Sequence, residues 1–288
     1  MRLIRFGPKG LERPGIEVGD RIVDLRRHFP DIPDIGETFF RNGWLDKVAG
    51  LDATGEPMAE RRGCPLDRPS KIICLGKNYA EHAKEGGFDQ SDKPLLFCKG
   101  SNALNGPYDP ILLPRSCGKI DWEVELAVVI GREAKRIRKA DARDVIAGVA
   151  IMNDVSGREA QFADSQWFRG KSLDSFAPLG PAIVTMEEIG DIQNLQLTAL
   201  VDGTVMQDGN SRDMIFDVAT LIEFISEDMT LYPGDVISTG TPSGVGYFRN
   251  PPVELKAGAV VECRIEKIGA IVNRVVDRLP GVRSEVHL

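Results

Sequence analysis

Short apolar runs separated by turn residues recur along most of the chain and predict a fold made mainly of strands. From Lys71 onward these runs are KIICLG, LLFCKG, ILLP, VELAVVIG, GVAIMND and DVISTG. The pair Asp202-Gly203 in LTALVDGTVMQ predicts a hairpin, because such pairs tolerate the positive φ of tight turns. A second hairpin is predicted around Gly269. With so few helices between them, the strands fit a mixed α+β fold and neither a parallel Rossmann sheet nor a TIM barrel.

One amphipathic helix is predicted in SRDMIFDVATLIEFISEDM, where Ile215, Val218, Leu221, Ile222 and Ile225 share a face. The first 65 residues predict a separate small α/β unit. MRLIRFG predicts a strand, GIEVGDRIVDL a hairpin at Gly19-Asp20, and GETFFRNGWLDKVAG a helix. RRGCPLDRPS, with its two prolines, predicts a linker. We therefore expect a small N-terminal domain over residues 1–65 and a main domain over 69–288.

Composition and charge exclude several classes of protein. Of the 288 residues, 42% are hydrophobic and 27% charged, which is typical of a globular chain. The net charge of −7, with Lys and Arg spread along the chain, argues against a nucleic-acid partner. The N-terminus lacks the apolar core of a signal peptide, and no apolar run approaches the roughly 20 residues that span a bilayer. We expect a soluble, cytoplasmic protein with no membrane partner.

The supply of metal-binding and disulfide-forming residues is small. The five cysteines are scattered and form no CxxC pair, and there are only three histidines. Neither a zinc site nor a disulfide framework is therefore indicated.

A pair of glutamates marks the entrance of one apolar run. Glu123 and Glu125 are two apart, so in a strand they share a face. Both faces of this run are apolar further in, which predicts a buried strand whose polar entrance opens into a cavity. Asp154 ends the run GVAIMND in a similar way. Three carboxylates with little histidine favour a hard divalent cation. The alternatives are two solvated glutamates on an edge strand and an aspartate that caps a helix or turn.

A second candidate group lies in GKNYAEHAKEGG. His82 and Glu85 are three apart, so on a helix Glu85 could orient His82 and make it a base for water. Gly86 and Gly87 would end that helix and allow hinge motion. The alternative is a surface helical turn with an incidental histidine.

Two glycine-containing segments resemble phosphate loops only in part. Gly170-Lys171-Ser172 lacks the required earlier glycine, because position 165 is serine. STGTPSGVG is either a strand-to-turn connection or a loop that lets a small ligand approach backbone N–H groups. No GxSxG motif exists, so a hydrolase of this sequence would rely on water and metal.

Four segments together resemble the fumarylacetoacetate hydrolase family: DWEVELAVVIG, GVAIMNDVSGRE, RGKSLDSFAPLGP and STGTPSGVG. The likeness covers roughly Pro69 to Asp277. The N-terminal MRLIRFGPKGLERPGI looks like bacterial members named ureidoglycolate lyases or 2,4-diketo-3-deoxy-sugar-acid hydrolases. The resemblance implies a mixed β-sandwich roll with few helices. It also implies a homodimer, with a tetramer as the alternative.

The resemblance also implies roles for individual residues. Glu123, Glu125 and Asp154 look like ligands of Mg²⁺, with Mn²⁺ as the alternative ion. His82 and Glu85 look like a water-activating pair on a lid that orders over the substrate. The implied substrate contacts are Arg158, Gln161, Lys171 and Thr241.

Three further points follow from the motifs. Lys171 would also be catalytic, by adding positive charge near the developing enolate. Gly157 stands where relatives often carry alanine, and we expect little effect from this difference. Asp121 belongs to the motif but is not usually a ligand, so it receives no role.

The implied activity is Mg²⁺-dependent cleavage of the C3–C4 bond of a 2,4-diketo acid to pyruvate and a carboxylic acid. A 2,4-diketo-3-deoxy-L-fuconate or -rhamnonate would give lactate as that acid. The alternatives on the same metal site are ureidoglycolate lyase, oxaloacetate decarboxylase and 2-oxo acid isomerase activity. A non-catalytic binding protein is a further alternative, but mere binding needs no base such as His82.

Overall fold

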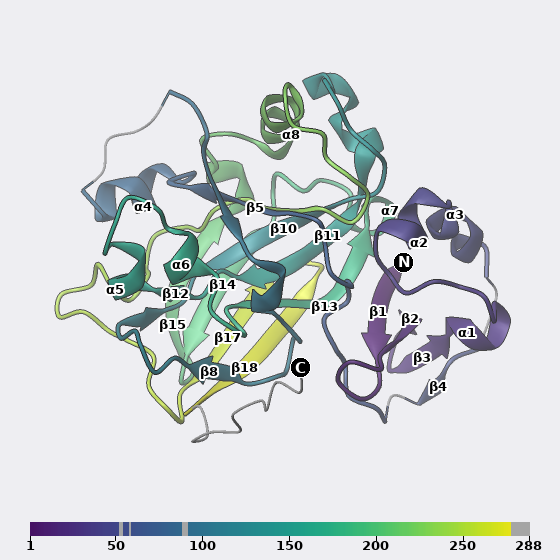
Figure 1. Ribbon diagram of the computed structural model, residues 1–288, viewed down its shortest axis with the longest axis horizontal. Coiled ribbons are helices and arrows are strands. Elements are labelled where there is room, and N and C mark those ends of the chain that lie inside the picture. The colour runs from purple at the N-terminus through teal and green to yellow at the C-terminus, as the bar shows by residue number, and fades with distance from the viewer. Residues whose placement is uncertain (52–53, 58, 88–91, 278–288) are drawn as a thin grey trace, which may run out of the picture.

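A large mixed sheet runs through the molecule, and the computed structural model describes it within residues 1–51, 54–57, 59–87 and 92–277 (Figure 1). Its order is β4 (Glu56–Pro57), β3 (Arg21–Asp24), β2 (Arg13–Val18), β1 (Arg2–Phe6), β13 (Ala177–Thr185), β11 (Ile146–Asn153), β10 (Val124–Ile130), β16 (Val236–Ser238), β5 (Ile72–Gly76) and β6 (Leu95–Lys99). The short β7 (Leu104–Asn105) pairs with β13.

A second sheet packs against β10, β11 and β13 of the first. Its order is β15 (Thr204–Asn210), β14 (Gln196–Val201), β17 (Val260–Ile265), β18 (Gly269–Asp277) and β8 (Ile111–Leu113). The two-residue strands β9 (Ile120–Asp121) and β12 (Ser156–Gly157) pair with each other. Every residue of β10 and β13 is buried, so the core lies between the two sheets. The strand-dominated α+β fold is confirmed, as are the three hairpins predicted at Gly19-Asp20, Asp202-Gly203 and Gly269.

The helices are short and lie outside the sheets. They are α1 (Leu25–His28), α2 (Glu37–Arg41), α3 (Trp44–Ala49), α4 (Ala80–Glu85), α5 (Arg158–Gln161), α6 (Phe168–Lys171), α7 (Met186–Ile189) and α8 (Val218–Ser226). The 3₁₀ turns are η1 (Ser101–Ala103), η2 (Lys139–Val145) and η3 (Ser211–Asp213). Among the described residues, no helix is long and apolar enough to cross a membrane.

Two predicted helices differ from the structure. The helix predicted from Ser211 begins instead at Val218, because the carboxylate of Asp217 caps it by accepting from Thr220 N at 2.7 Å. The helix predicted over residues 36–50 is divided at Gly43, whose φ of 69° lies in the left-handed region and ends α2 before α3 begins.

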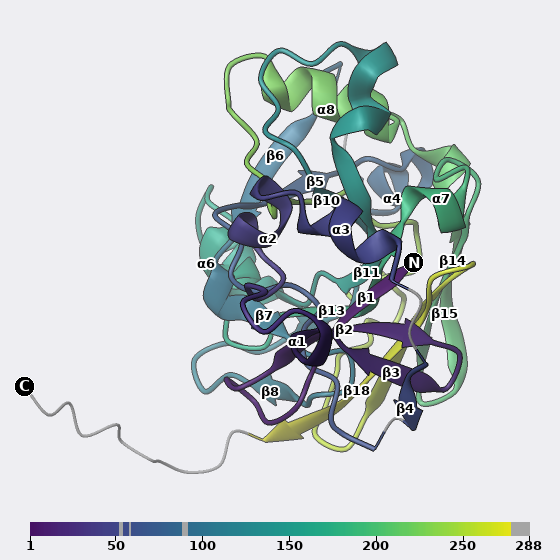
Figure 2. The same cartoon turned by 90° about the vertical axis from the view of Figure 1, so that its right-hand side faces the viewer.

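The N-terminal strands continue the large sheet. β1 pairs antiparallel with β13, and Figures 1 and 2 show the two strands side by side. The segment predicted as a linker contributes buried side chains, Cys64 and Leu66. The division into domains at residues 1–65 and 69–288 stays a prediction, and its last eleven residues, 278–288, lie outside the described part of the chain.

Candidate metal and proton-transfer site

Three buried carboxylates meet where β10 begins and β11 ends. The two strands run antiparallel, with Val124 opposite Asn153, and Asp154 N donates to Glu123 O at 2.9 Å. One oxygen each of Glu123, Glu125 and Asp154 lies within 4.8 Å of the other two. β10 is flanked by β11 and β16, so it is a central strand. The alternative of solvated glutamates on an edge strand is therefore wrong.

Two buried lysines neutralise part of this cluster. Lys171 Nζ lies 2.6 Å from Glu123 Oε2 and 2.8 Å from Asp154 Oδ2. Lys99 Nζ, at the end of β6, lies 2.6 Å from Asp154 Oδ1. Burial acts to lower the pKa of Lys171, but the charges of Asp154 and Glu123 outweigh burial and raise it to about 12. Lys171 is therefore a permanent cation at neutral pH.

The remaining glutamate, Glu125, carries the negative charge that is least compensated. Its Oε2 accepts from Ser238 Oγ at 2.5 Å and from Gly240 N at 3.0 Å. Burial, together with the negative charges of Asp154 and Glu123, holds the pKa of Glu125 well above its ordinary value. A positive charge placed at the cluster would relieve this repulsion.

The predicted His82–Glu85 pair forms on α4. His82 Nδ1 lies 3.3 Å from Glu85 Oε2, and the His82 side chain is buried and lines the same cleft as Glu123. Glu85 also accepts from Gly244 N at 3.1 Å, which fixes the carboxylate from a second side. The alternative of a surface turn with an incidental histidine is wrong, because a surface histidine would not be buried in a cleft.

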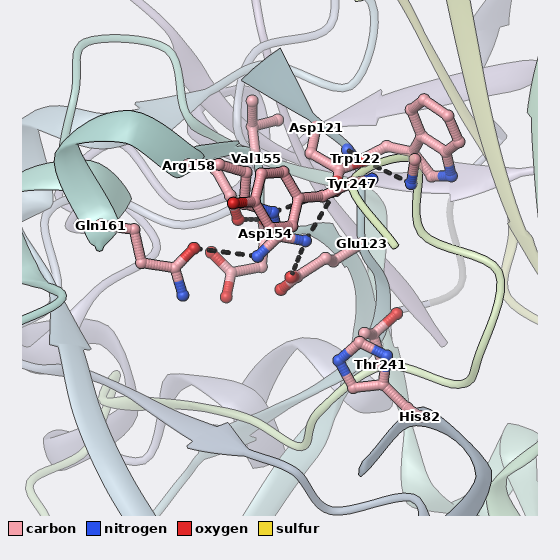
Figure 3. Close-up of polar contacts among 12 residues, drawn as sticks. His82, Asp121, Trp122, Glu123, Asp154, Val155, Arg158, Gln161, Thr241 and Tyr247 are labelled. Atoms are coloured by element: carbon pink, nitrogen blue, oxygen red, sulfur yellow. Dashed lines mark hydrogen bonds and ion pairs between the residues drawn. The ribbon is translucent and has the colours of Figure 1, made fainter. Parts of the chain in front are cut away.

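Arg158 and Gln161 lie on α5 and face the cluster from the side opposite His82. Figure 3 shows Glu123 between Arg158 and His82. Arg158 Nη2 lies 2.7 Å from Glu123 Oε1, and Nη1 donates to Gln161 Oε1 at 2.9 Å. Thr241 also lines the cleft, and its hydroxyl donates to Val124 O at 2.9 Å. Seven of the nine predicted site residues line one cleft of about 400 Å³ including its open mouth, and the other two, Glu85 and Asp154, contact the lining residues His82 and Lys171.

Comparison with known proteins identifies the family. The model described as fumarylacetoacetate (FAA) hydrolase C-terminal matches residues 71–276, which is more than half of the chain. The chain belongs to this family. The resemblance seen in the four sequence motifs is thereby confirmed, and the protein is an enzyme of the fumarylacetoacetate hydrolase family.

Relatives in this family match over almost their full length. The oxaloacetate tautomerase FAHD2A, mitochondrial, of Bos taurus is 43% identical, with 96% of this chain and 92% of the relative covered. The crystal structure of 5-carboxymethyl-2-hydroxymuconate delta-isomerase from Mycobacterium smegmatis has a TM-score of 0.78 at 35% identity, covering 96% of this chain and 99% of that one. Maleylpyruvate hydrolase from Sphingobium sp. SYK-6 has a TM-score of 0.79 at 30% identity, covering 96% and 100%.

The acidic cluster of this family member fits a divalent cation. All three side chains offer oxygen donors, which hard cations such as Mg²⁺ and Mn²⁺ prefer. Burial and the charges of Asp154 and Glu123 raise the pKa of Glu125, so a cation bound there would stabilise its carboxylate form. All three side chains are buried, and Glu123 and Glu125 line the cleft. The identity of the ion stays a prediction.

Several residues that support the site carried no local sequence signal. Gln207 of β15 accepts from Val124 N at 3.0 Å and donates to Thr241 Oγ1 at 2.8 Å. Lys99 ends an ordinary apolar run, and Ser238 ends another. Their partners lie more than 30 residues away in the chain, so only the fold brings them together. Asp121 belongs to one of the sequence motifs, but the sequence predicted no role for it.

The glycine-rich segment Ser238–Gly246 uses its amides on the protein itself. Gly240 N donates to Glu125, Gly244 N to Glu85, and Gly246 N to Asp121 at 2.7 Å. A Cβ at Gly244 would lie 2.1 Å from Met206 O, and one at Gly246 would lie 2.2 Å from Val253 O. The glycines are therefore required by close backbone packing. These three amides therefore hold carboxylates of the site, and Thr241 of the same segment lines the cleft.

Proposed function

We propose that the protein transfers a proton between carbon and oxygen of a small 2-oxo acid, with oxaloacetate as its substrate. The observation that carries this proposal is the cleft itself. It is lined by a carboxylate-oriented histidine, His82, by two glutamates of a cluster suited to a divalent cation, and by the cationic side chains of Arg158 and Lys171. Keto–enol exchange needs a base and a stabilised enolate, and this cleft offers groups for both. A relative named oxaloacetate tautomerase supports the choice of substrate.

His82 is suited to move the proton. Its Nδ1 faces the Glu85 carboxylate, so Nδ1 carries the hydrogen and Nε2 is left as the basic nitrogen. In the keto-to-enol direction His82 removes a proton from C3, the C3–H electron pair becomes the C2–C3 double bond, and the C2 oxygen receives a proton. The reverse direction returns the proton to C3. The cation that Glu123, Glu125 and Asp154 would hold supplies Lewis-acid polarisation of the 2-oxo group.

The charge of the site suits an anionic substrate. The buried carboxylates carry one more negative charge than the buried cations neutralise; the carboxylates are Asp121, Glu123, Glu125 and Asp154, and the cations are Lys99, Arg158 and Lys171. A divalent cation therefore leaves the site net positive, which favours a carboxylate ligand. Lys171, which remains charged, and Arg158 are the side chains that would contact it.

The second candidate is hydrolysis of the C3–C4 bond of a 2,4-diketo acid, the reaction predicted from the sequence. The His82–Glu85 pair favours it, because the same pair could deprotonate a water that attacks C4. The products would be pyruvate and a carboxylic acid, with lactate from a 2,4-diketo-3-deoxy-fuconate or -rhamnonate. A structure named maleylpyruvate hydrolase, 30% identical, supports this class. Ureidoglycolate cleavage and oxaloacetate decarboxylation use the same site and are weaker candidates.

A substrate panel separates these reactions. Purified protein with Mg²⁺ or Mn²⁺ is given enol-oxaloacetate, a set of 2,4-diketo acids and ureidoglycolate, and loss of the enol and release of pyruvate, CO₂ and glyoxylate are measured. We expect the highest kcat/KM for oxaloacetate ketonisation without release of CO₂. A higher kcat/KM for pyruvate release from a diketo acid would replace tautomerisation with hydrolysis.

A pair of histidine variants tests the base. His82→Asn should lower kcat by about 10²–10⁴-fold, the usual contribution of a general acid–base group, while Mn²⁺ affinity stays unchanged. His28→Asn is the matched control, because His28 is exposed on α1. Equal activity of the two variants would remove His82 from the reaction.

A further inference from the structure

Asp121 lies at the end of β9 and is almost completely buried, and its carboxylate joins two walls of the cleft. Toward α5, Oδ2 accepts from Arg158 Nε at 3.0 Å and from Nη2 at 2.7 Å. Toward the segment after β16, Oδ1 accepts from Gly246 N at 2.7 Å and Oδ2 from Tyr247 N at 3.0 Å. Oδ1 also accepts from the neighbouring Trp122 N at 2.9 Å.

The contacts to Arg158 fix the plane of its guanidinium. Two donors on one edge of the group, Nε and Nη2, are held by one carboxylate, so rotation about the last side-chain bonds is prevented. Nη2 is then directed to Glu123 and Nη1 to Gln161. Burial acts to lower the pKa of Arg158, but the charges of Glu123 and Asp121 outweigh burial and raise it.

The contacts to the backbone fix an aromatic wall over the same guanidinium. The rings of Tyr247 and Phe248 lie 5.3 Å apart, and each ring centroid lies 5.9 Å from Arg158 Cζ. The Phe248 ring also lies 6.1 Å from the His82 ring. A shift of the backbone at Tyr247 would therefore move the groups between Arg158 and His82. Figure 3 shows Asp121, Arg158, Tyr247 and Glu123 gathered in this way.

We propose that Asp121 is a positioning residue that sets the Arg158 guanidinium and the Tyr247–Phe248 wall as one unit. Asp121 itself is separated from the substrate by Arg158 and Tyr247, so it acts through them. The proposal rests on the proposed role of Arg158 in binding the substrate carboxylate. It assigns a function to a residue that the family motif contains but that holds no cation.

Asp121→Asn is the informative substitution, because asparagine keeps the shape and one acceptor oxygen. Its amide nitrogen faces donors in either orientation. At the Oδ2 position these are Arg158 Nε, Arg158 Nη2 and Tyr247 N, and at the Oδ1 position they are Trp122 N and Gly246 N. Donors that face each other do not bond, so the guanidinium and the wall lose their common support. Loss of a hydrogen bond between charged groups corresponds to about a 10- to 100-fold change in affinity.

Asp235→Asn is the matched control. Asp235 is also a fully buried aspartate that accepts from backbone amides, those of Lys71 and Tyr232, and pairs with a cation, Lys71 Nζ. It does not line the cleft. If removing any buried carboxylate that binds backbone amides were enough to weaken oxalate binding, Asp235→Asn would weaken it as much as Asp121→Asn.

Binding of oxalate, a rigid dianion with adjacent carboxylates, is measured by calorimetry in Mg²⁺ buffer, together with kcat and KM for oxaloacetate. We expect Asp121→Asn to weaken oxalate binding and raise KM by about 10- to 100-fold, with a smaller effect on kcat. In an Arg158→Lys background the same substitution should weaken oxalate binding less, because only the Tyr247–Phe248 wall is then left for Asp121 to position. Asp235→Asn should match the wild type in oxalate affinity.

A spectroscopic readout needs no turnover. The ¹H–¹⁵Nε signal of Arg158, assigned by its absence in Arg158→Lys, should be sharp and protected from exchange in the wild type and in Asp235→Asn. It should be exchange-broadened in Asp121→Asn. An unchanged signal in Asp121→Asn, an unchanged oxalate affinity, or an equal loss in the Arg158→Lys background would overturn the proposal. If these results hold but the wild type does not turn over oxaloacetate, only the proposed function fails.

Discussion

Asp154 pairs with two cationic side chains, as Glu123 does, and this decides how the site responds to the loss of Asp154. Lys99 Nζ and Lys171 Nζ each lie within 2.8 Å of one of its oxygens, and both lysines are buried. Lys171 also bonds Glu123, so its ammonium lies between two of the three predicted ligands. A cation and this ammonium cannot share that space, so we expect metal binding to move the Lys171 side chain.

Replacing Asp154 with alanine should destabilise the metal-free protein strongly. Lys99 would lose its carboxylate partner and Lys171 one of its two, and a broken buried ion pair typically costs about 3–5 kcal/mol. Glu125→Ala is the contrasting variant, because Glu125 bonds Ser238 and Gly240 and is crowded by like charges. In urea denaturation with EDTA, Asp154→Ala should have a much lower free energy of unfolding than Glu125→Ala. The reverse order would contradict this account of the lysines.

Gly157 was expected to matter little, but the structure places Cys117 against it. A Cβ at Gly157 would lie 2.6 Å from Cys117 Sγ and 3.3 Å from Leu173 Cδ1. Gly157→Ala should therefore cost about 1–3 kcal/mol, the usual range for overpacking. Adding Cys117→Ala removes the sulfur and should recover most of that loss, which a double-mutant cycle by thermal or urea unfolding measures. Additive losses would show that the sulfur is not the obstacle.

The residues that could be predicted share a feature: their position along the chain already fixes their direction. Glu125 lies in β10 and Glu123 just before its first residue, and His82 and Glu85 are three apart in a helix, so each pair follows from local geometry. Lys99, Gln207 and Ser238 reach the site through pairing of distant strands. No local period marks them, so sequence patterns alone could not find them.

At the scale of elements, the strands were predicted better than the helices. Apolar runs between turn residues marked β5, β6, β8, β10, β11 and β16, and the hairpins β14–β15 and β17–β18 followed from their turn residues. The helix around α8 was predicted too long, because its apolar period extends across Asp217. The carboxylate of Asp217 caps the N-terminus of α8, so the helix begins after it, and Ser211–Asp213 forms a separate turn.

Removing the cap of α8 should therefore destabilise the protein at neutral pH. Asp217→Ala removes the acceptor for Thr220 N and should cost about 1 kcal/mol. Asp217→Asn keeps an acceptor oxygen and is the control. It should lose less stability than Asp217→Ala. Both are compared with the wild type by urea unfolding at pH 7. Equal losses would mean that the ion pair with Lys139, 2.6 Å away, contributes more than the cap.

The same carboxylate gives a pH dependence of defined sign. Partial burial acts to raise the pKa of Asp217, but hydrogen bonds from Lys139 and Thr220 outweigh it and lower the pKa below its ordinary value of 3.8. A lowered folded-state pKa means that the contribution is present above 3.8 and is lost as the pH falls through the folded-state value. The difference in free energy of unfolding between the wild type and Asp217→Ala should therefore narrow only as the pH falls below 3.8 toward the lowered pKa of Asp217.

At the scale of the whole molecule, the sequence predicted the core of the catalytic region but not how the N-terminal part attaches. The composition of residues 61–70 resembles a linker, yet Cys64 and Leu66 are buried. Pairing of β1 with β13 joins positions 180 residues apart, Leu3 with Ile183, for which no local pattern exists. The continuity of the sheet follows from this pairing.

A chain that begins at Leu66 should therefore fail to fold as a stable unit. Without β1, the strand β13 would lose its neighbour at Ile183 and Val184, and the sheet would expose a new edge prone to aggregation. The buried Leu3 and Ile4 would also be missing from the core, and Asp109 would lose its ion pair with Arg61. Co-expression of residues 1–65 as a separate chain is the control and should restore a soluble complex. Size-exclusion chromatography and urea unfolding are the measurements. If residues 66–288 alone unfold cooperatively and bind Mn²⁺ like the full chain, the domain boundary predicted from the sequence is correct and the shared sheet is dispensable.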